Sequence, residues 1–296
     1  MKIDLPRNAA IAGAIALLTA VGGMSFVLGS SRGGAASAEE GPAAIGEARE
    51  ASLTVAVPNV VNDKIYGAET AAGRPIVVID AGHGGRDPGA RSVSGEVVEK
   101  DLTLALAKEL RDQLVERGRV RVALTRGDDS YLTLEDRAEV ARRLGAAMFV
   151  SLHMDSAPNP LARGASVYSL SDVASDAEAA RFAAMDKGSA DSVEGGGTVQ
   201  SMLADLVMRS QMSASADLAT RLVKRSAGRF ELRPEPHKFA AFHVLRSAHT
   251  PAVLFEAGYL SNADDEVLLR TPQHRSDIAL ALAQAIEADV ASRGRR

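Results

Sequence analysis

Three polar side chains that could bind a metal ion or transfer a proton each follow an apolar, strand-like run of the sequence. His83 comes shortly after IVVID, His153 directly after MFVSL and Glu256 directly after AVLF. Parallel strands of one sheet would bring these side chains to its carboxyl edge, where open α/β sheets bind their ligands. Glu99, at the start of the next helical segment, returns to the same edge through the loop after His83.

These residue types suit a hydrolase that uses zinc. Two histidines and a carboxylate form a catalytic zinc set that leaves the fourth coordination position to water or substrate. Zinc lowers the pKa of bound water to about 7, and a nearby carboxylate can then accept the proton. We therefore expect Zn2+ to bind to His83, Glu99 and His153. Glu256 is the expected base, and Asp155 is a weaker candidate for orienting His153 or the substrate.

The glycines around His83 raise a second interpretation, a phosphate-binding loop. The stretch GHGGRDPG does not match G-x-G-x-x-G, and the chain has neither a Walker A lysine pattern nor a G-x-S-x-G motif. The chain has no cysteine, which removes thiolate chemistry, and its net charge of -4 gives no reason to expect a nucleic-acid partner. We expect structural or surface roles for the remaining histidines, which are His237, His243, His249 and His274.

Strand-like and helical patterns alternate along the sequence from about residue 75 onward. The strands are apolar runs without polar alternation, which is typical of a parallel sheet buried on both faces. The expected strands lie at 76–80, 120–125, 148–152, 165–170, 242–245 and 252–255, and the expected helices at 101–115, 134–144, 176–187, 200–225 and 276–291. The predicted fold is an α/β, doubly wound, largely parallel twisted sheet with helices on both faces and a helical insertion.

The N-terminal region has the pattern of an export segment. Lys2 and Arg7 precede an apolar run over 9–28, and residues 36–38 have the A-x-A pattern of a signal-peptidase site. The run is also long enough to span a bilayer, so residues 1–38 are expected to be either a signal peptide or a membrane anchor. We expect an exported, periplasmic protein that contacts the membrane only through this segment, and only if the segment is not cleaved.

The rest of the chain divides into a linker and one catalytic domain. Residues 39–74 are small and polar and lack sustained periodicity, so we expect a linker with one short strand at 53–57. Residues 75–293 have the size of a single α/β domain. Within it, about 171–230 is longer than a crossover between strands requires, and we interpret this part as an insertion.

Five segments resemble the zinc-dependent N-acetylmuramoyl-L-alanine amidases of the amidase-3 family. They are, in the order of that family, IVVIDAGHGGRDPGA, VVEKDLTLALAKEL, VALTRGDDSYLTLEDRAEVAR, FVSLHMDSAPN and VLRSAHTPAVLFEAGYLSN. The resemblance covers about 75–293. It implies that zinc binds to His83, Glu99 and His153. It also implies that Glu256 is catalytic, and that the substrate is the amide between N-acetylmuramic acid and the L-alanine of the peptidoglycan stem peptide.

Further polar residues match the family without an expected part in the chemistry. Asn262, in YLSN, is expected to shape the loop in which it lies, and Arg126 and Arg137 are expected to form salt bridges that support the fold. Glu96 lies in the same loop as Glu99 and leaves the choice of ligand open between the two. We prefer Glu99 because it lies in the EK pair of the motif.

The insertion contains two helical pieces of different character. The piece at 200–225 is expected to pack on the sheet through Leu203, Leu206, Val207, Leu218, Leu222 and Val223. The piece at 176–187 is alanine-rich and precedes the glycine run 195–197, as a movable lid requires, although a surface helix without a regulatory role has the same pattern. Division-associated members of the resembled family carry a helix here that blocks the zinc site until an activator protein displaces it. Glu178, with Asp186 second, is our candidate for filling the open zinc position.

Two other functions fit the same fold. A non-catalytic peptidoglycan-binding or regulatory homologue would lack a metal ligand or the base, but all four residues are present. A zinc exopeptidase would usually need a second metal set, and the sequence shows no additional His/Asp cluster for one. We therefore predict an amidase that acts on peptidoglycan in cell separation and is autoinhibited by the inserted helix.

Overall fold

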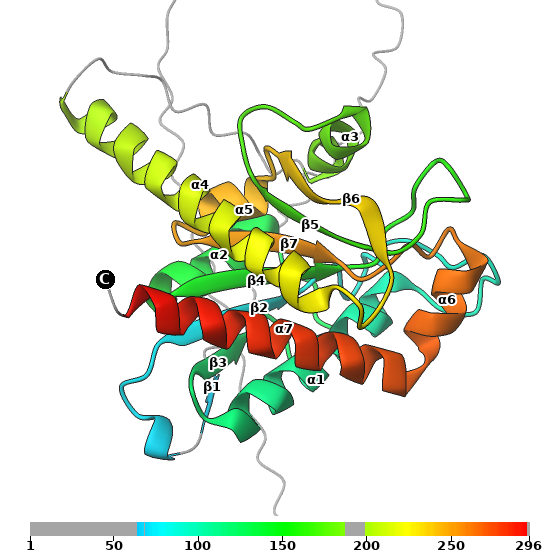
Figure 1. The fold of residues 1–296 in the computed structure, drawn as a ribbon, viewed down its shortest axis with the longest axis horizontal. Helices are drawn as coiled ribbons and strands as arrows, with labels where there is room; N and C mark the ends of the chain where they lie inside the picture. Colours follow the sequence, from blue (N-terminus) through cyan, green and yellow to red (C-terminus); the bar gives the residue numbers. More distant parts are fainter. Residues whose placement is uncertain (1–63, 68, 187–198, 295–296) are drawn as a thin grey trace, which may run out of the picture. The chain divides into compact units, whose positions relative to one another are not determined.

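The computed structural model of the chain describes residues 64–67, 69–186 and 199–294 (Figure 1). The export segment, the short strand expected at 53–57 and the glycine run of the insertion lie outside these residues. Among the described residues, no helix has the length and apolar character needed to cross a membrane.

Within the described part of the chain, seven strands form one sheet in the order β1-β3-β2-β4-β7-β5-β6. The strands are β1 (Ile65–Tyr66), β2 (Ile76–Ala81), β3 (Arg121–Leu124), β4 (Met148–His153), β5 (Ala165–Leu170), β6 (Leu232–Ala240) and β7 (Ala252–Glu256). The four central strands β3, β2, β4 and β7 are parallel, whereas β1 and β5 pair antiparallel with β3 and β7. The expected largely parallel α/β sheet is confirmed.

Helices cover both faces of this sheet (Figure 1). One buried cluster joins the sheet to α1 (Glu99–Arg117), the C-terminal half of α4 (Val199–Ser226) and α7 (Pro272–Arg293). The other cluster joins it to α2 (Leu134–Arg143), α3 (Ala177–Met185) and α5 (His243–Ser247). The helix α6 (Ala263–Arg270) connects β7 to α7, and a short 3-10 helix, η1 (Glu69–Ala71), connects β1 to β2.

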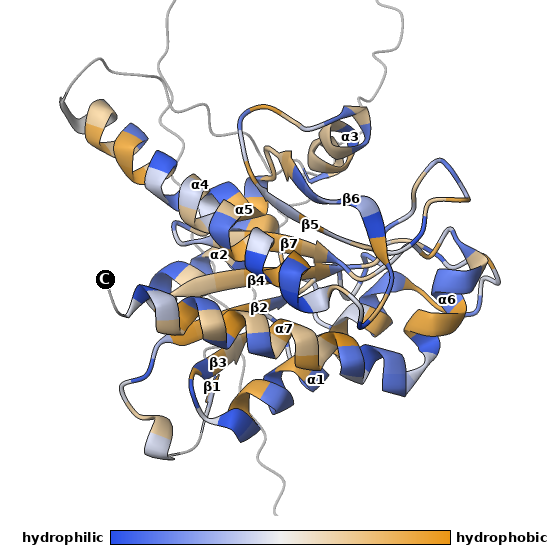
Figure 2. Ribbon diagram, in the orientation of Figure 1, coloured by the Kyte–Doolittle hydropathy of each residue, from blue (hydrophilic) through white to orange (hydrophobic). Residues whose placement is uncertain are grey.

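β2 shows why the sequence lacks polar alternation in its strands. All six of its residues are buried. Val77, Ile79 and Ala81 belong to the cluster under α1 and α7, while Ile76 and Val78 belong to the cluster under α2 and α5. Because both faces of the strand are covered, every position is apolar except Asp80, and the central strands are strongly hydrophobic (Figure 2).

The strand expected at 242–245 is wrong, and the sixth strand lies earlier in the chain. Residues 243–247 form α5, and the strand is β6. A short apolar run such as FHVL does not distinguish a buried strand from one turn of helix. β6 contains Pro234 and Pro236, which argue against a strand in the interior of a sheet, but β6 is an edge strand with a bulge and tolerates them.

Two further expectations need correction. Ile65 and Tyr66, placed in the linker from their composition, pair with β3 and begin the sheet. The apolar stripe of α4 packs on the protein only in its second half, where Leu218 and Leu222 are fully buried. In the first half the side chains of Leu203, Leu206 and Val207 remain 56%, 63% and 56% exposed.

Candidate active site

Close backbone approach explains the glycines that surround His83. A Cβ atom on Gly82 would lie 2.5 Å from the ring of His153. A Cβ atom on Gly89 would lie 2.6 Å from both the Glu99 carboxylate and the His83 ring. Neither distance is available to a real side chain, so the two glycines leave room for the three polar groups to converge.

The carboxylate of Glu99 lies between the two histidines. Its Oε2 is 3.1 Å from Nε2 of His83, and its Oε1 is 3.0 Å from Nδ1 of His153. One ligand atom from each of the three residues falls within 4.8 Å of the others. A set of two imidazoles and one carboxylate at these separations fits a zinc ion with an open fourth position. The structure thus brings together all three expected ligands.

Backbone N–H groups hold Glu99 in place, and Glu96 is directed elsewhere. Glu99 is fully buried, and its two oxygens accept hydrogen bonds from the N–H groups of Ala90 and Met154 at 2.9 Å each. Glu96 instead forms an ion pair with Arg270 at 2.6 Å. The geometry therefore supports Glu99 in the choice between the two glutamates that the sequence leaves open.

A second carboxylate, which the sequence analysis missed, orients His83. Oδ2 of Asp87 lies 2.8 Å from Nδ1 of His83, so Nε2 is directed toward Glu99. Burial lowers the pKa of an imidazole, but Glu99 and Asp87 together raise that of His83 to about 10. Two carboxylates thus favour a positive charge at this point, as a metal site requires. The spacing of four residues between His83 and Asp87 is the signal that could have revealed the pair.

Glu256 lies at the end of β7, directly beside His153 in the register of the sheet. Its side chain is 2% exposed, and its Oε2 accepts a hydrogen bond of 3.1 Å from the N–H of Asp155. Burial, followed by the negative charges of Asp155 and Glu99, raises the pKa of Glu256 well above the usual range of a glutamate. A buried carboxylate with a raised pKa has the properties of a proton acceptor in catalysis.

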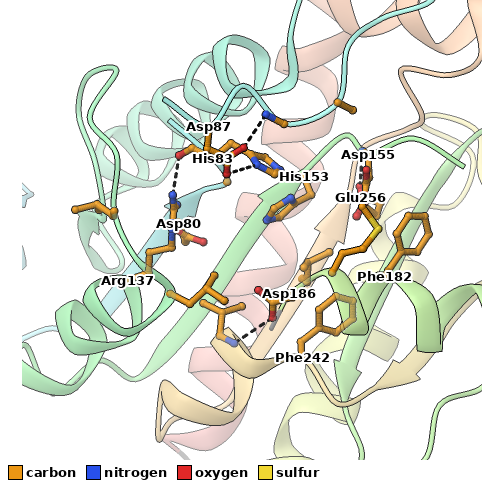
Figure 3. A pocket seen from close by; sticks show the side chains of 18 of the residues that line it. Asp80, His83, Asp87, Arg137, His153, Asp155, Phe182, Asp186, Phe242 and Glu256 are labelled. Atoms are coloured by element: carbon orange, nitrogen blue, oxygen red, sulfur yellow. Dashed lines mark hydrogen bonds and ion pairs between the residues drawn. The ribbon is translucent and has the colours of Figure 1, made fainter. Parts of the chain in front are cut away.

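A cavity of about 640 Å3 opens over these residues and continues across the face of the sheet (Figure 3). His83, His153 and Glu256 line it at the carboxyl edge. Tyr131 and Leu132, in the loop before α2, line one side, and Phe242 and Val244, at the start of α5, line another. The helix α3 closes the remaining side with the residues Arg181, Phe182 and Met185, and with Asp186 directly after it.

The structure places the two candidates for blocking the site differently. Glu178 forms a bidentate ion pair with Arg233 of β6, at 2.7 and 3.0 Å, and is not among the residues that line the cavity. Asp186 lines the cavity together with His153 (Figure 3). Burial raises the pKa of Asp186 to about 6 even though it accepts a hydrogen bond from the N–H of Val244. The geometry therefore favours Asp186 over Glu178 as a residue that faces the site.

Of the remaining candidate residues, Asp155 and Arg137 line the cavity, whereas Asn262 does not. Asn262 caps α6, because its side chain accepts hydrogen bonds from the N–H groups of Asp264 and Asp265. It also donates a hydrogen bond to the carbonyl oxygen of Pro160, so it ties together two loops beyond the strands. The only histidines among the described residues that line the cavity are His83 and His153. The other four, which are His237, His243, His249 and His274, do not line it.

Comparison with known proteins agrees with this geometry. A family model described as Amidase_3, N-acetylmuramoyl-L-alanine amidase, matches residues 77–288. The chain is 36% identical over 225 residues to the N-acetylmuramoyl-L-alanine amidase AmiA of Escherichia coli (strain K12). This alignment covers 74% of this chain and 77% of that protein. It is 34% identical over 220 residues to AmiC of Neisseria meningitidis serogroup B, covering 72% of this chain and 52% of that protein.

Solved structures lead to the same family. The N-acetylmuramoyl-L-alanine amidase from Clostridium difficile 630 aligns with a TM-score of 0.56 at 25% identity, over 75% of this chain and 99% of that chain. The catalytic domain of the amidase CwlV from Bacillus (Paenibacillus) polymyxa aligns with a TM-score of 0.50 at 29% identity, over 72% of this chain and 96% of that chain. This chain therefore belongs to the Amidase_3 family of N-acetylmuramoyl-L-alanine amidases, enzymes that act on peptidoglycan.

Proposed function

We propose that this amidase is zinc-dependent and cleaves the amide bond between N-acetylmuramic acid and the L-alanine of the stem peptide. The observation that carries the proposal is the buried Glu99 carboxylate between His83 and His153, with Glu256 beside them on the next strand. When bound by the three ligands, zinc supplies a Lewis acid for the amide carbonyl and lowers the pKa of water to about 7.

The side chains around the metal ligands would carry out the proton transfers of the reaction. Glu256 accepts a proton from the attacking water and passes it to the departing amine of L-alanine, because its raised pKa suits both transfers. The N–H of Asp155 holds one oxygen of Glu256, which leaves the other oxygen free for the proton. His83 and His153 remain as ligands, the former oriented by Asp87.

Digestion of peptidoglycan tests this reaction directly. The purified protein, stripped of metal with a chelator, is expected to release nothing, and addition of zinc is expected to restore release of stem peptides that begin with a free L-alanine amino group. Mass spectrometry and amino-terminal labelling identify the product. New reducing sugar ends, or activity that survives complete removal of zinc, would show that another bond or another mechanism is involved.

We also propose that the chain is exported and acts in cell separation. The substrate of a peptidoglycan amidase lies outside the cytoplasmic membrane, which agrees with residues 1–38 as a signal peptide or anchor. The catalytic domain would include β1 as well as residues 75–293, so the linker ends before Ile65. A reporter enzyme that is active only outside the cytoplasm, fused after residue 74, is expected to be active. A fusion that works only inside the cytoplasm would contradict the assignment.

The helix α3 is proposed to restrict access to the site. It forms one wall of the cavity, and its Phe182 contacts Tyr168 and Tyr259 with ring centroids 6.2 Å apart in each case. The pair Glu178–Arg233 fastens the start of the helix to β6. The helix is thus anchored more firmly than its alanine-rich sequence suggests. Movement of α3 away from β6 would widen the cavity.

Loss of the anchor is therefore expected to raise basal activity. In Glu178→Ala the ion pair with Arg233 is removed, and about 1 kcal/mol of lost attachment would raise the open fraction about fivefold. Release of dye from labelled peptidoglycan measures the gain. Glu139→Ala, which removes an ion pair with Arg142 within α2, is the control for loss of a glutamate–arginine pair and should leave the rate unchanged. Equal rates in wild type and Glu178→Ala would contradict the role of α3.

The exposed half of α4 is proposed to bind an activator protein. Four of its apolar side chains, Met202, Leu203, Leu206 and Val207, are each more than half exposed and follow one another at helical spacing. The CwlD amidase from Clostridioides difficile, which shares the fold with a TM-score of 0.53, has been solved in complex with the GerS lipoprotein. A protein partner that covers this stripe would act on the insertion that also contains α3.

A further inference from the structure

His83 adopts a backbone conformation that a residue with a side chain rarely adopts. Its φ of 60° lies in the left-handed region, and the only other described residue besides glycine with a positive φ is His249. Such a conformation persists when the surroundings impose it. The ring contacts of His83 with Asp87 and Glu99 orient the side chain but do not fix the carbonyl group on the other side of the Cα atom.

Arg137 reaches that carbonyl group from α2 (Figure 3). Its side chain is 4% exposed, and its Nη2 donates a hydrogen bond of 2.7 Å to the carbonyl oxygen of His83. Its Nη1 donates to the carbonyl oxygen of Ala81 at 2.7 Å and to the carboxylate of Asp80 at 2.8 Å. Both terminal nitrogens are therefore bound to oxygens of the strand and loop that carry the metal ligand.

Arg126, directly beyond β3, binds the same loop from another direction. It is 2% exposed, and it donates to the carbonyl oxygens of Ala81 and Gly82 at 2.9 Å each. Its Nη2 also donates to the carbonyl oxygen of Lys100 at 2.8 Å, in the turn of α1 that begins with Glu99. Arg126 therefore joins the segment that carries one metal ligand to the segment that carries another.

Placing the guanidinium groups of Arg126 and Arg137 close together inside the protein is electrostatically unfavourable. Burial, and then the charge of Arg137, lowers the pKa of Arg126. Asp80 is buried beside Arg137 and also binds the hydroxyl groups of Thr125 and Ser151, at 2.7 and 2.6 Å. Burying two positive charges next to a site that binds a third costs folding free energy. The planar guanidinium group of arginine can bind several carbonyl groups in fixed directions. A lysine ammonium group could not reproduce this geometry.

We propose that Arg137 and Arg126 are positioning residues that set the metal affinity of the site, by holding His83 in its left-handed conformation and fixing its distance from Glu99. The inference rests on the zinc site of the proposed function, and it goes beyond the supporting role expected from the sequence, which Arg137 also fills through its ion pair with Asp80. Neither residue is a ligand. Each acts through the backbone of a segment that carries one.

Zinc affinity in Arg137→Lys and Arg126→Lys tests the proposal. Loss of a group that orients a metal ligand lowers metal affinity by about 10- to 100-fold, and we expect this range for each variant. Competition with a chromogenic chelator measures the zinc Kd, and the visible absorption of the cobalt-substituted protein reports the ligand geometry. Thr103→Val removes a hydroxyl that donates to the carbonyl oxygen of Gly82 at 2.8 Å and accepts from Nη2 of Arg126 at 3.2 Å. Because both arginines stay in place, this variant is expected to give a smaller loss.

Arg275→Lys is the matched control. Arg275 also donates to two backbone carbonyl groups, those of Leu269 and Arg270, and to the carboxylate of Glu109, but at the corner between α6 and α7. It is expected to lose thermal stability while keeping the wild-type zinc Kd and cobalt spectrum. If Arg137→Lys and Arg126→Lys behave like this control, the arginines only support the fold and the proposal is overturned.

The two proposals fail in different ways. A wild-type protein without a tight zinc site would contradict the proposed function, whatever the variants do. A wild-type protein with tight zinc and arginine variants with the same affinity would contradict only the positioning role. If Arg137→Lys does not fold, Arg126→Lys and Thr103→Val decide the result, since each loosens the same loop from a different element.

Discussion

Glu256→Gln is expected to lose turnover and to keep its metal. Glutamine has the shape of glutamate and can still accept the hydrogen bond from the N–H of Asp155, but it cannot accept the proton of the attacking water. Removal of a general base lowers the rate by about 10²- to 10⁴-fold, so kcat should fall by that factor. Zinc content after dialysis should stay at the wild-type level, because Glu256 is not part of the ligand group. Single-turnover release of stem peptides and metal analysis measure the two effects.

Stability gives this variant a second readout. Because the pKa of Glu256 is raised by burial, its ionised form destabilises the fold at a pH above the usual pKa of a glutamate, and neutral glutamine removes that cost. The Tm at neutral pH should therefore not fall. Glu287→Gln is the control for loss of a buried carboxylate. It breaks the ion pair between Glu287 of α7 and Arg117 of α1 and should lower Tm without changing turnover. Full activity or loss of zinc in Glu256→Gln would refute the assigned role.

Glu99→Gln is expected to lose zinc and activity together. The substitution replaces a charged ligand with a neutral amide and removes the negative charge between His83 and His153. Since one of three protein ligands is weakened, we expect zinc affinity to fall on the order of 10³-fold. Zinc competition assays and release of dye from labelled peptidoglycan should show parallel losses. His153→Ala is expected to behave in the same way.

Glu96→Gln is the matched control for this experiment. Glu96 belongs to the same loop and is the alternative ligand by sequence, but its carboxylate pairs with Arg270. The variant should keep wild-type zinc affinity and activity and should lose at most the small stabilisation of an exposed ion pair. Zinc loss in Glu96→Gln, with normal zinc binding in Glu99→Gln, would reverse the assignment of the ligand.

The positions of His83, His153 and Glu256 could be predicted because each lies at or just beyond the end of a strand. An apolar run ends, a polar residue follows, and a parallel sheet brings such residues to one edge, as it does for His153 and Glu256. The partners of the ligands were harder to predict. Asp87 lies in a loop whose bridge between Gly84 and Asp87 determines where its carboxylate points. The carbonyl groups that Arg126 and Arg137 bind have no signature in the sequence at all.

The elements of the fold were predictable where burial determined the pattern. β2, β4 and β7 are covered on both faces, and their apolar runs identify them. The sequence was misleading near the edge of the sheet, since β6 has one neighbour and can contain prolines and charged residues. The first half of α4 has the apolar stripe of a buried helix, but no other described element covers Leu203 or Leu206.

Both outer strands of the sheet are unsuited to pairing with another molecule. β1 has only two residues. β6 contains Pro234 and Pro236, which have no N–H to donate, and further along it the backbone of Phe239 exchanges hydrogen bonds with Ser175 in the segment before α3. Neither edge therefore offers a row of free N–H and C=O groups on which a neighbouring chain could add a strand. Strand addition at either edge of the described sheet is accordingly not expected in concentrated protein.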